Sequence, residues 1–338
     1  MDFISFFLRH ATCFISGTIL FFALLSCNDK QDAMKSDDTA TVYPYAYLFE
    51  DDWHAPDTSS LGKSSNDDLI RYGRELIVNT ANYFGPVGKI NHESNGMNCQ
   101  NCHLYAGTKL YANSFSAVFA NYPKFRARSG TVEDLGKRID DCMERSLNGK
   151  KIPNDSKEKN AMIAYINWIG KGVAKNKTPD GAAVIDVPYL NRAADTSLGK
   201  IAYEKNCVTC HKINGEGQLN ADGSFLYPPL WGNHSYNTAA GMYRLSRLAG
   251  FIKSNMPYLT STHDKPILSD AETWDIAAYI NSLQRPKKNF AADWHEIAKK
   301  PVDHPFGPYA DSFSETRHKY GPFGIMKKSK PINTSTFK

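Results

Sequence analysis

Apolar residues recur at helical spacing along both halves of the chain, and the two halves repeat one order of elements. Each half opens with a predicted helix, at residues 67–79 and 198–205, and closes with an amphipathic helix. The closing helices share the core tetrapeptide Ala-Tyr-Ile-Asn, at residues 164–167 and 278–281. Strand signals are sparse. The pattern therefore predicts an all-α protein with an internal repeat.

A further amphipathic segment in the first half, at residues 132–148, indicates a helix that ends at Gly149. Its apolar stripe consists of Val132, Leu135, Ile139 and Met143. Arg138, Cys142 and Ser146 follow one another at i, i+4 and i+8 beside this stripe. One face of the predicted helix thus carries a guanidinium, a thiol and a hydroxyl in line.

Composition divides the chain into five parts. We expect a signal segment at residues 1–26, a polar tether at 27–60, one domain at 61–184, a second at 185–286 and an extension at 287–338. The two domains meet at a linker near residues 178–187. The extension is rich in proline and aromatic residues, so we expect a strap packed over the domains rather than a disordered tail.

The N-terminus has the pattern of a targeting segment. An apolar run at residues 11–25, short for a spanning helix, is followed by Ser26, Cys27 and a polar stretch. Small residues before a cysteine at this point resemble a bacterial lipobox, in which Cys27 carries lipid, and an uncleaved anchor is the alternative. Either arrangement exports the body of the protein. We therefore expect it on the periplasmic side of the cell envelope, anchored to a membrane.

Overall composition narrows the range of partners. With 41% hydrophobic and 22% charged residues, the chain resembles an ordinary soluble globular protein. The formal net charge of +5 is modest and is not gathered into a basic arm, so nucleic acid is not an expected partner.

The pentapeptide Cys-x-x-Cys-His occurs twice, at residues 99–103 and 207–211. This spacing is the attachment signal for haem c, in which two thiols form thioethers with the porphyrin and the next histidine binds iron. A zinc site built from the two Cys-x-x-Cys pairs is the alternative, but it gives no reason for a histidine directly after each pair. We therefore expect two covalently bound haem c groups, attached at Cys99, Cys102, Cys207 and Cys210 and ligated by His103 and His211.

An opening helix, a haem motif, a layer of loops and a closing helix form the layout of class I cytochrome c domains. The expected fold is therefore all-α, with two fused domains of this class and a C-terminal strap. A protein of this plan moves electrons.

Each haem also needs a sixth iron ligand. In the second half, Met256 is followed by proline in a loop before the closing helix, which is the usual position of a thioether ligand. Met256 is therefore the expected ligand. The competing side chains are Met242, Lys253, His234 and His263.

Cys142 is the cysteine that remains after the others are assigned. Cys13 leaves with the signal segment, Cys27 takes lipid and four cysteines take haem. Cys142 is then a lone thiol in an oxidising compartment. A small buried hydrophobe is the ordinary role of such a residue.

The helix around Cys142 favours a chemical role instead. The guanidiniums of Arg138 and Arg145 lie within about one helical turn of the thiol and are expected to lower its pKa, which favours the thiolate. A thiolate is a strong, soft iron ligand, so Cys142 is the expected sixth ligand of the first haem. Met97 and Met143 are the alternative ligands.

These ligand pairs predict a direction for electron flow. Thiolate ligation lowers the reduction potential of a haem, whereas methionine ligation raises it. Electrons that enter at the first haem are therefore expected to run downhill to the second.

Several stretches resemble the dihaem thiosulfate dehydrogenases, which form tetrathionate. They are residues 95–108 around the first haem motif, 122–128, 138–149, 300–311 and 321–323. The resemblance covers about residues 65–325. Its most specific part is the block Cys-Met-Glu-Arg-Ser-x-Asn-Gly, which begins at Cys142, whereas many cytochromes share the haem motifs.

The resemblance implies that two thiosulfates are joined into tetrathionate with release of two electrons, in a reaction that can run in reverse. It implies that Cys142 is both the distal ligand of the catalytic haem and the sulfur centre of the reaction. The implied substrate-pocket residues are Arg128, Arg138 and Ser146. Two thiosulfates bring about four negative charges, and guanidinium groups suit their oxygens, so Arg126 and Arg145 are further candidates.

At the second haem, the resemblance again implies Met256 as the distal ligand. Some family members carry a lysine directly before this methionine and exchange the two ligands on reduction. Asn255 occupies that position here, so the exchange is not expected in this chain.

Two other classes of protein share these features. One is a membrane-tethered dihaem cytochrome that only transfers electrons, and the other is a cytochrome that loads sulfur onto a carrier protein. A simple carrier gains nothing from a reactive thiol beside arginines, and turnover of small anions distinguishes an enzyme from a sulfur-loading cytochrome. For the enzyme, the expected electron acceptor is a soluble or membrane cytochrome c.

Overall fold

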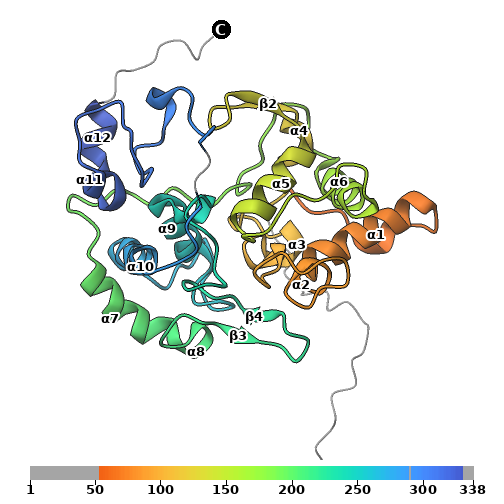
Figure 1. Ribbon diagram of the computed structural model, residues 1–338, viewed down its shortest axis with the longest axis horizontal. Helices are drawn as coiled ribbons and strands as arrows, with labels where there is room; N and C mark the ends of the chain where they lie inside the picture. Colours follow the sequence, from red (N-terminus) through yellow and green to blue (C-terminus); the bar gives the residue numbers. More distant parts are fainter. Residues whose placement is uncertain (1–52, 289–290, 330–338) are drawn as a thin grey trace, which may run out of the picture. The chain divides into compact units, whose positions relative to one another are not determined.

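The structure is a computed structural model that describes residues 53–288 and 291–329 (Figure 1). The expected signal segment, most of the tether and the lipid-bearing Cys27 lie outside the described residues. Within the described ranges, no helix combines the length and the apolar character that crossing a bilayer requires.

The first half is built from helices joined by long loops. Its helices are α1 (Ser65–Val78), α2 (Thr80–Phe84), α3 (Leu104–Gly107), α4 (Val118–Asn121), α5 (Leu135–Arg145) and α6 (Lys157–Gly170). One antiparallel hairpin, β1 (Lys124–Arg126) and β2 (Thr131–Glu133), precedes α5. Short 3₁₀ turns occupy Thr58–Ser60 and Cys99–Asn101.

The second half repeats this plan. Its helices are α7 (Thr196–Asn206), α8 (Val208–His211), α9 (Leu245–Asn255) and α10 (Asp270–Ser282), with a hairpin of β3 (Gln218–Leu219) and β4 (Phe225–Tyr227) and a 3₁₀ turn at Gly241–Tyr243. Ser269 and Glu272 form the capping box that starts α10. The strap adds a 3₁₀ turn at Ile297–Lys299, α11 (Glu315–Tyr320) and α12 (Phe323–Ser329). The predicted all-α fold with an internal repeat is confirmed.

A glycine lets the opening and closing helices of each half meet backbone to backbone. A Cβ added at Gly73 of α1 would lie 1.9 Å from the carbonyl oxygen of Ala161 in α6. A Cβ at Gly199 of α7 would lie 1.9 Å from the carbonyl oxygen of Asp275 in α10. The repeat seen in the sequence is therefore a repeat of one helix crossing.

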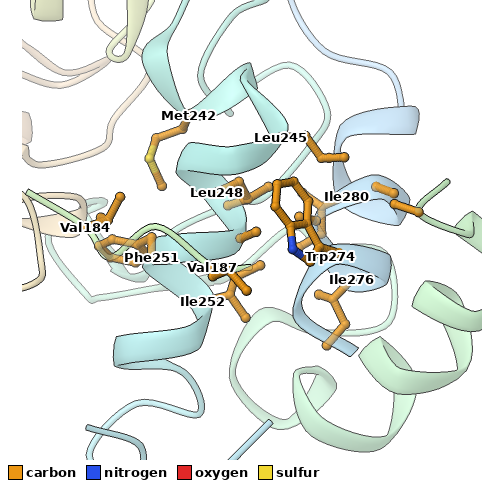
Figure 2. Close-up of a cluster of buried hydrophobic side chains, with 14 of the residues drawn as sticks. Val184, Val187, Met242, Leu245, Leu248, Phe251, Ile252, Trp274, Ile276 and Ile280 are labelled. Atoms are coloured by element: carbon orange, nitrogen blue, oxygen red, sulfur yellow. The ribbon is translucent and has the colours of Figure 1, made fainter. Parts of the chain in front are cut away.

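Each half has its own apolar core. Figure 2 shows the core of the second half, where Trp274 and Ile280 of α10 lie with Leu248 and Phe251 of α9. The core of the first half contains the buried apolar residues of α1, α5 and α6, including Leu76, Ile139, Met143, Tyr165 and Ile166. Each closing helix therefore contributes the apolar positions of its shared tetrapeptide to a core.

The helix predicted at residues 132–148 begins later and ends earlier in the structure. Asp134 caps α5 by accepting a hydrogen bond from the backbone N–H of Lys137, so the helix starts at Leu135. Val132 lies in β2, paired with Phe125, and its side chain is 67% exposed. The assignment of Val132 to the apolar stripe was therefore wrong, because its hairpin pairing with the preceding strand overrides the helical periodicity.

The proline-rich extension packs against the second half, as predicted for a strap. Phe323 and Met326 of α12 are buried in the second core. Arg244, which precedes α9, donates two hydrogen bonds to Asp303 of the strap, at 3.0 and 2.6 Å. Burial alone would raise the pKa of Asp303, but Arg244 and the hydrogen bonds from Ser246 outweigh it and the net pKa is lowered.

We predict that Gly73→Ala and Gly199→Ala each destabilise the protein. The new methyl group has to push two helix backbones apart, at a cost of about 3 kcal/mol, which outweighs the gain of about 1 kcal/mol in helix propensity. Thermal unfolding of the haem-loaded protein should show a loss of about 4–8 °C. Gly172→Ala is the control, since nothing lies within 4 Å of a Cβ there. Equal melting temperatures for all three variants would contradict this packing.

We also predict that Asp303→Asn lowers the free energy of unfolding by about 2–3 kcal/mol at neutral pH. Because the folded pKa of Asp303 is lowered, the stability it contributes is present above the unfolded pKa of about 3.9 and is lost as pH falls through the folded pKa. Denaturant titrations should therefore show the difference from wild type shrinking below about pH 4. Asp186→Asn, whose exposed carboxylate lies 3.7 Å from Arg247, should change little at either pH.

Candidate functional site

The first haem motif opens into a cavity of about 350 Å³ in the first half. Cys99, Cys102 and His103 line the cavity together with Cys142 and Met143 of α5. The backbone N–H of Cys99 donates to the hydroxyl of Thr80 at 3.0 Å, which fixes the start of the motif. The cavity therefore joins the attachment cysteines to the helix that carries the lone thiol.

The histidine of each motif is held by one ring nitrogen. Nδ1 of His103 lies 2.6 Å from the carbonyl oxygen of Asn113, and Nδ1 of His211 lies 2.8 Å from that of Pro228. A carbonyl accepts only from N–H, so each Nδ1 is the protonated nitrogen and Nε2 is the one that can bind iron. These two backbone acceptors were not identified from the sequence. The donor set in both halves fits haem c.

Cys142 lies on α5 between Arg138 and the ring of His103. The guanidinium Nη1 of Arg138 donates to Sγ of Cys142 at 3.3 Å. Desolvation alone would raise the pKa of Cys142, but Arg138 and then a hydrogen bond with His103 outweigh it and lower the pKa to about 6. Cys142 is therefore largely a thiolate at neutral pH, on the same cavity as the proximal histidine.

The two arginines predicted beside the thiol have different surroundings. Arg138 lies beside the thiol of Cys142. The guanidinium of Arg145 instead donates two hydrogen bonds to the carboxylate of Asp293 in the strap, at 2.7 and 2.9 Å. Nε of Arg145 also lies 3.6 Å from Asp141. Sequence periodicity could not have indicated this, since Asp293 is far away along the chain.

The predicted substrate-pocket residues divide between two cavities. Arg138 and Ser146 line the cavity of Cys142, and so does Arg126. Arg128 lines a separate cavity beside the strap, and its Nη2 lies 2.6 Å from Asp141. Thus Arg128 contacts the neighbour of Cys142 in sequence.

A buried carboxylate near this cavity was not identified from the sequence. Glu133 of β2 is 2% exposed, and one of its oxygens lies 3.9 Å from Nε of Arg126. Desolvation is the main cause of the raised pKa of Tyr122, and the Cys142 thiolate is the main cause of the raised pKa of Arg138; the charge of Glu133 adds to both. Tyr122 and Arg138 both line the cavity. The sequence pattern predicts a helix over this segment and so does not indicate that Glu133 is buried. In the structure Glu133 lies in β2, which directs its side chain inward.

The second haem motif opens into a cavity of about 380 Å³. Met256, which follows the last residue of α9, lines it together with Cys207, Cys210 and His211. Met242 lines the same cavity, so both methionines remain within the set of candidate ligands.

Two other candidate ligands make contacts elsewhere. Nζ of Lys253 lies 2.8 Å from Asp270 and donates to the carbonyl oxygen of Leu268 at 2.7 Å. The ring of His263 stacks on Tyr111, with 3.6 Å between the ring centroids. These contacts favour a methionine as the ligand from this half.

Three residues line both haem-motif cavities. They are Met97, Asn98 and Cys102. Asn98 also fixes this segment, because its side chain accepts a hydrogen bond from the backbone N–H of Ala81 at 2.8 Å. The two cavities are thus separated by a single stretch of chain, which suits transfer of electrons between them.

Comparisons with known proteins agree with this architecture. The family model described as "SoxA/TsdA, cytochrome c domain" matches residues 89–174, and the model described as "Cytochrome c" matches residues 196–284. The thiosulfate dehydrogenase of Allochromatium vinosum is 40% identical over 255 residues, which cover 73% of this chain and 85% of that protein. The thiosulfate dehydrogenase of Stutzerimonas stutzeri is 35% identical over 232 residues, 69% of this chain and 72% of that protein.

A solved structure is similar over the same part of the chain. It is the thiosulfate dehydrogenase TsdBA from Marichromatium purpuratum in its as-isolated form, with a TM-score of 0.65 and 30% sequence identity. The match covers 70% of this chain and 50% of the Marichromatium purpuratum chain. By the extent of its identity to these relatives, the chain belongs to the SoxA/TsdA cytochrome c family and, within it, to the thiosulfate dehydrogenases.

Proposed function

We propose that the protein oxidises thiosulfate to tetrathionate at Cys142 and passes the electrons through the second half to an external acceptor. The observation that carries this proposal is the contact between Arg138 and the Cys142 thiolate, in one cavity with His103. The names of the relatives support thiosulfate as the substrate.

Haem c, when bound, supplies the one-electron acceptors that a two-electron oxidation of sulfur requires. In the first cavity, Cys99 and Cys102 would attach it, and His103 and Cys142 would hold the iron. In the second cavity, the corresponding residues would be Cys207, Cys210, His211 and Met256.

The side chains around Cys142 suit two dianions. Arg126 and Arg138 bring positive charge to the cavity, and planar guanidiniums bind the oxygens of a sulfonate group as they bind phosphate. Ser146 adds a hydroxyl at the C-terminal end of α5. Glu133 behind Arg126 limits the net charge, so that substrate is attracted without being held too tightly.

The sulfur of Cys142 is the proposed site of a covalent intermediate. Its thiolate and the terminal sulfur of one thiosulfate form an S–S bond with loss of two electrons, which gives a cysteine S-thiosulfonate. The terminal sulfur of a second thiosulfate then attacks the thiosulfate-derived sulfur of this bond. The products are tetrathionate and the regenerated thiolate, and no proton is transferred in either step.

The cellular setting is also a proposal. The apolar run at residues 11–25, followed by Ser26 and Cys27, supports export to the periplasmic side and attachment to a membrane by lipid. The acceptor would then be a soluble or membrane cytochrome c. A dihaem cytochrome that only transfers electrons is the alternative, and it leaves the Arg138–Cys142 contact without a purpose.

We predict that Cys142→Gly abolishes thiosulfate oxidation with ferricyanide as acceptor, because the sulfur that carries the covalent intermediate is lost, while both haems remain attached. Denaturing gels stained for haem report the attachment. Glu144→Gly is the control, because a glycine at this position destabilises α5 to a similar extent and the thiol of Cys142 is kept. Activity of Cys142→Gly close to that of the control would rule out this mechanism.

We predict that Arg138→Gln lowers kcat/KM for thiosulfate about 10- to 100-fold. Loss of the guanidinium removes about 1.5–3 kcal/mol of charge-assisted hydrogen bonding to the anion and to Sγ. Lys137→Gln is a neighbouring control, since its ammonium pairs with Asp141 rather than with the thiol. Equal kinetics for the two variants would remove Arg138 from the reaction.

A further inference from the structure

A third cavity, of about 870 Å³, lies beside the strap. Its walls come from Arg128, from residues 238–244 before α9, and from strap residues between 287 and 319. None of the residues that line it lines either haem-motif cavity. Haem is therefore not its occupant.

The walls of this strap cavity are strongly basic. Six cationic side chains line it, against the single carboxylate of Asp293, which pairs with Arg145. The six are Arg128, Arg244, Lys287, Lys288, Lys300 and Lys319. Arg128 and Arg244 pair with Asp141 and Asp303, neither of which lines the cavity.

Lys300 shows how the fold holds this charge in place. Its side chain is largely buried, with the residue 7% exposed, and Nζ donates to the carbonyl oxygens of Phe306 and Pro308, both at 2.9 Å. These two carbonyl oxygens fix the ammonium group at the wall of the cavity, where its positive charge can attract an anion.

The state of His304 is consistent with a positive potential in the cavity. Desolvation first, and then the charges of Lys300 and Arg244, lower its pKa to about 4. The ring is neutral at physiological pH, and its Nε2 accepts a hydrogen bond from Nε1 of Trp294 at 3.0 Å. The stacked pair of Tyr243 and Phe306, with 5.7 Å between centroids, adds apolar wall. The cavity thus combines positive charge with flat apolar surface, which suits an elongated anion with charged ends.

We propose that the strap cavity is a second binding site for a sulfur oxyanion dianion, separate from the site at Cys142. The ligand class is a divalent anion that bears sulfonate oxygens, such as thiosulfate or tetrathionate, and this identity rests on the proposed function.

Arg128 links the two sites. It lines the strap cavity, and its guanidinium binds Asp141, the residue directly before Cys142 in α5. An anion in the strap cavity therefore lies one ion pair away from the reacting thiol. Such a site would raise the local concentration of substrate and receive the product.

Selenate is a suitable probe, because it is a tetrahedral dianion that needs no turnover to bind. Crystals of the haem-loaded protein would be soaked in sodium selenate and measured at the selenium edge, and selenate would be titrated calorimetrically at fixed ionic strength. The test variant is Lys287→Glu/Lys319→Glu. The matched control is Lys327→Glu/Lys328→Glu on α12, which changes the charge equally on exposed residues outside the cavity.

We expect two selenium positions in wild type, one near Arg138 and one in the strap cavity, and two binding events. The test variant should lose the strap position, with at least tenfold weaker binding there and an unchanged position near Arg138. The control should keep both, and tetrathionate should displace selenate from the strap cavity. A single position near Arg138 in wild type, or equal binding by the two variants, would overturn the proposal. Selenate binding does not depend on turnover, so an active Cys142→Gly variant would overturn the proposed function and leave this result unaffected.

Discussion

The backbone contact between the opening and closing helix of each half is the constraint on which the rest of the structure depends. Because Gly73 and Gly199 have no side chain, α1 meets α6 and α7 meets α10 at a spacing that no other residue allows. In the first half, this crossing positions the closing helix α6 beside the segment that follows the haem motif. The hydroxyl of Tyr165 donates a hydrogen bond to the carbonyl oxygen of Ala106 in that segment, at 3.0 Å. Helix packing thereby fixes the segment that follows His103.

What distinguishes the halves is α5. The two domains share a frame, and each places a helix before its closing helix, α5 in the first half and α9 in the second. Asp134 caps α5, and Cys142 of this helix lines one cavity with His103. In the second half, Met242 and Met256 from the region around α9 line the cavity instead. One scaffold thus brings a thiol beside an arginine to one cavity and thioether sulfurs to the other.

Local features of the fold could be predicted from the sequence, and nonlocal ones could not. The haem motifs, the shared tetrapeptides and the Arg138–Cys142–Ser146 line depend on spacing within one segment, so the order of residues is enough to reveal them. The start of α5 was misplaced because Val132 pairs with Phe125 in a hairpin. Likewise, Arg145 binds Asp293, more than a hundred residues away, and Arg128 faces the strap cavity. Periodicity carries no information about such partners.

The segment shared by both haem-motif cavities has a kinetic consequence. Cys102, a proposed attachment residue of the first cavity, is at the same time part of the wall of the second. An electron donor bonded to Cys102 would keep a fixed distance from an electron acceptor that packs against Cys102 in the second cavity, because the same short stretch of backbone borders both cavities. Tunnelling between the two centres would then need neither a docking event nor a domain rotation, and turnover would be governed by the arrival of anions and the departure of electrons at the surface.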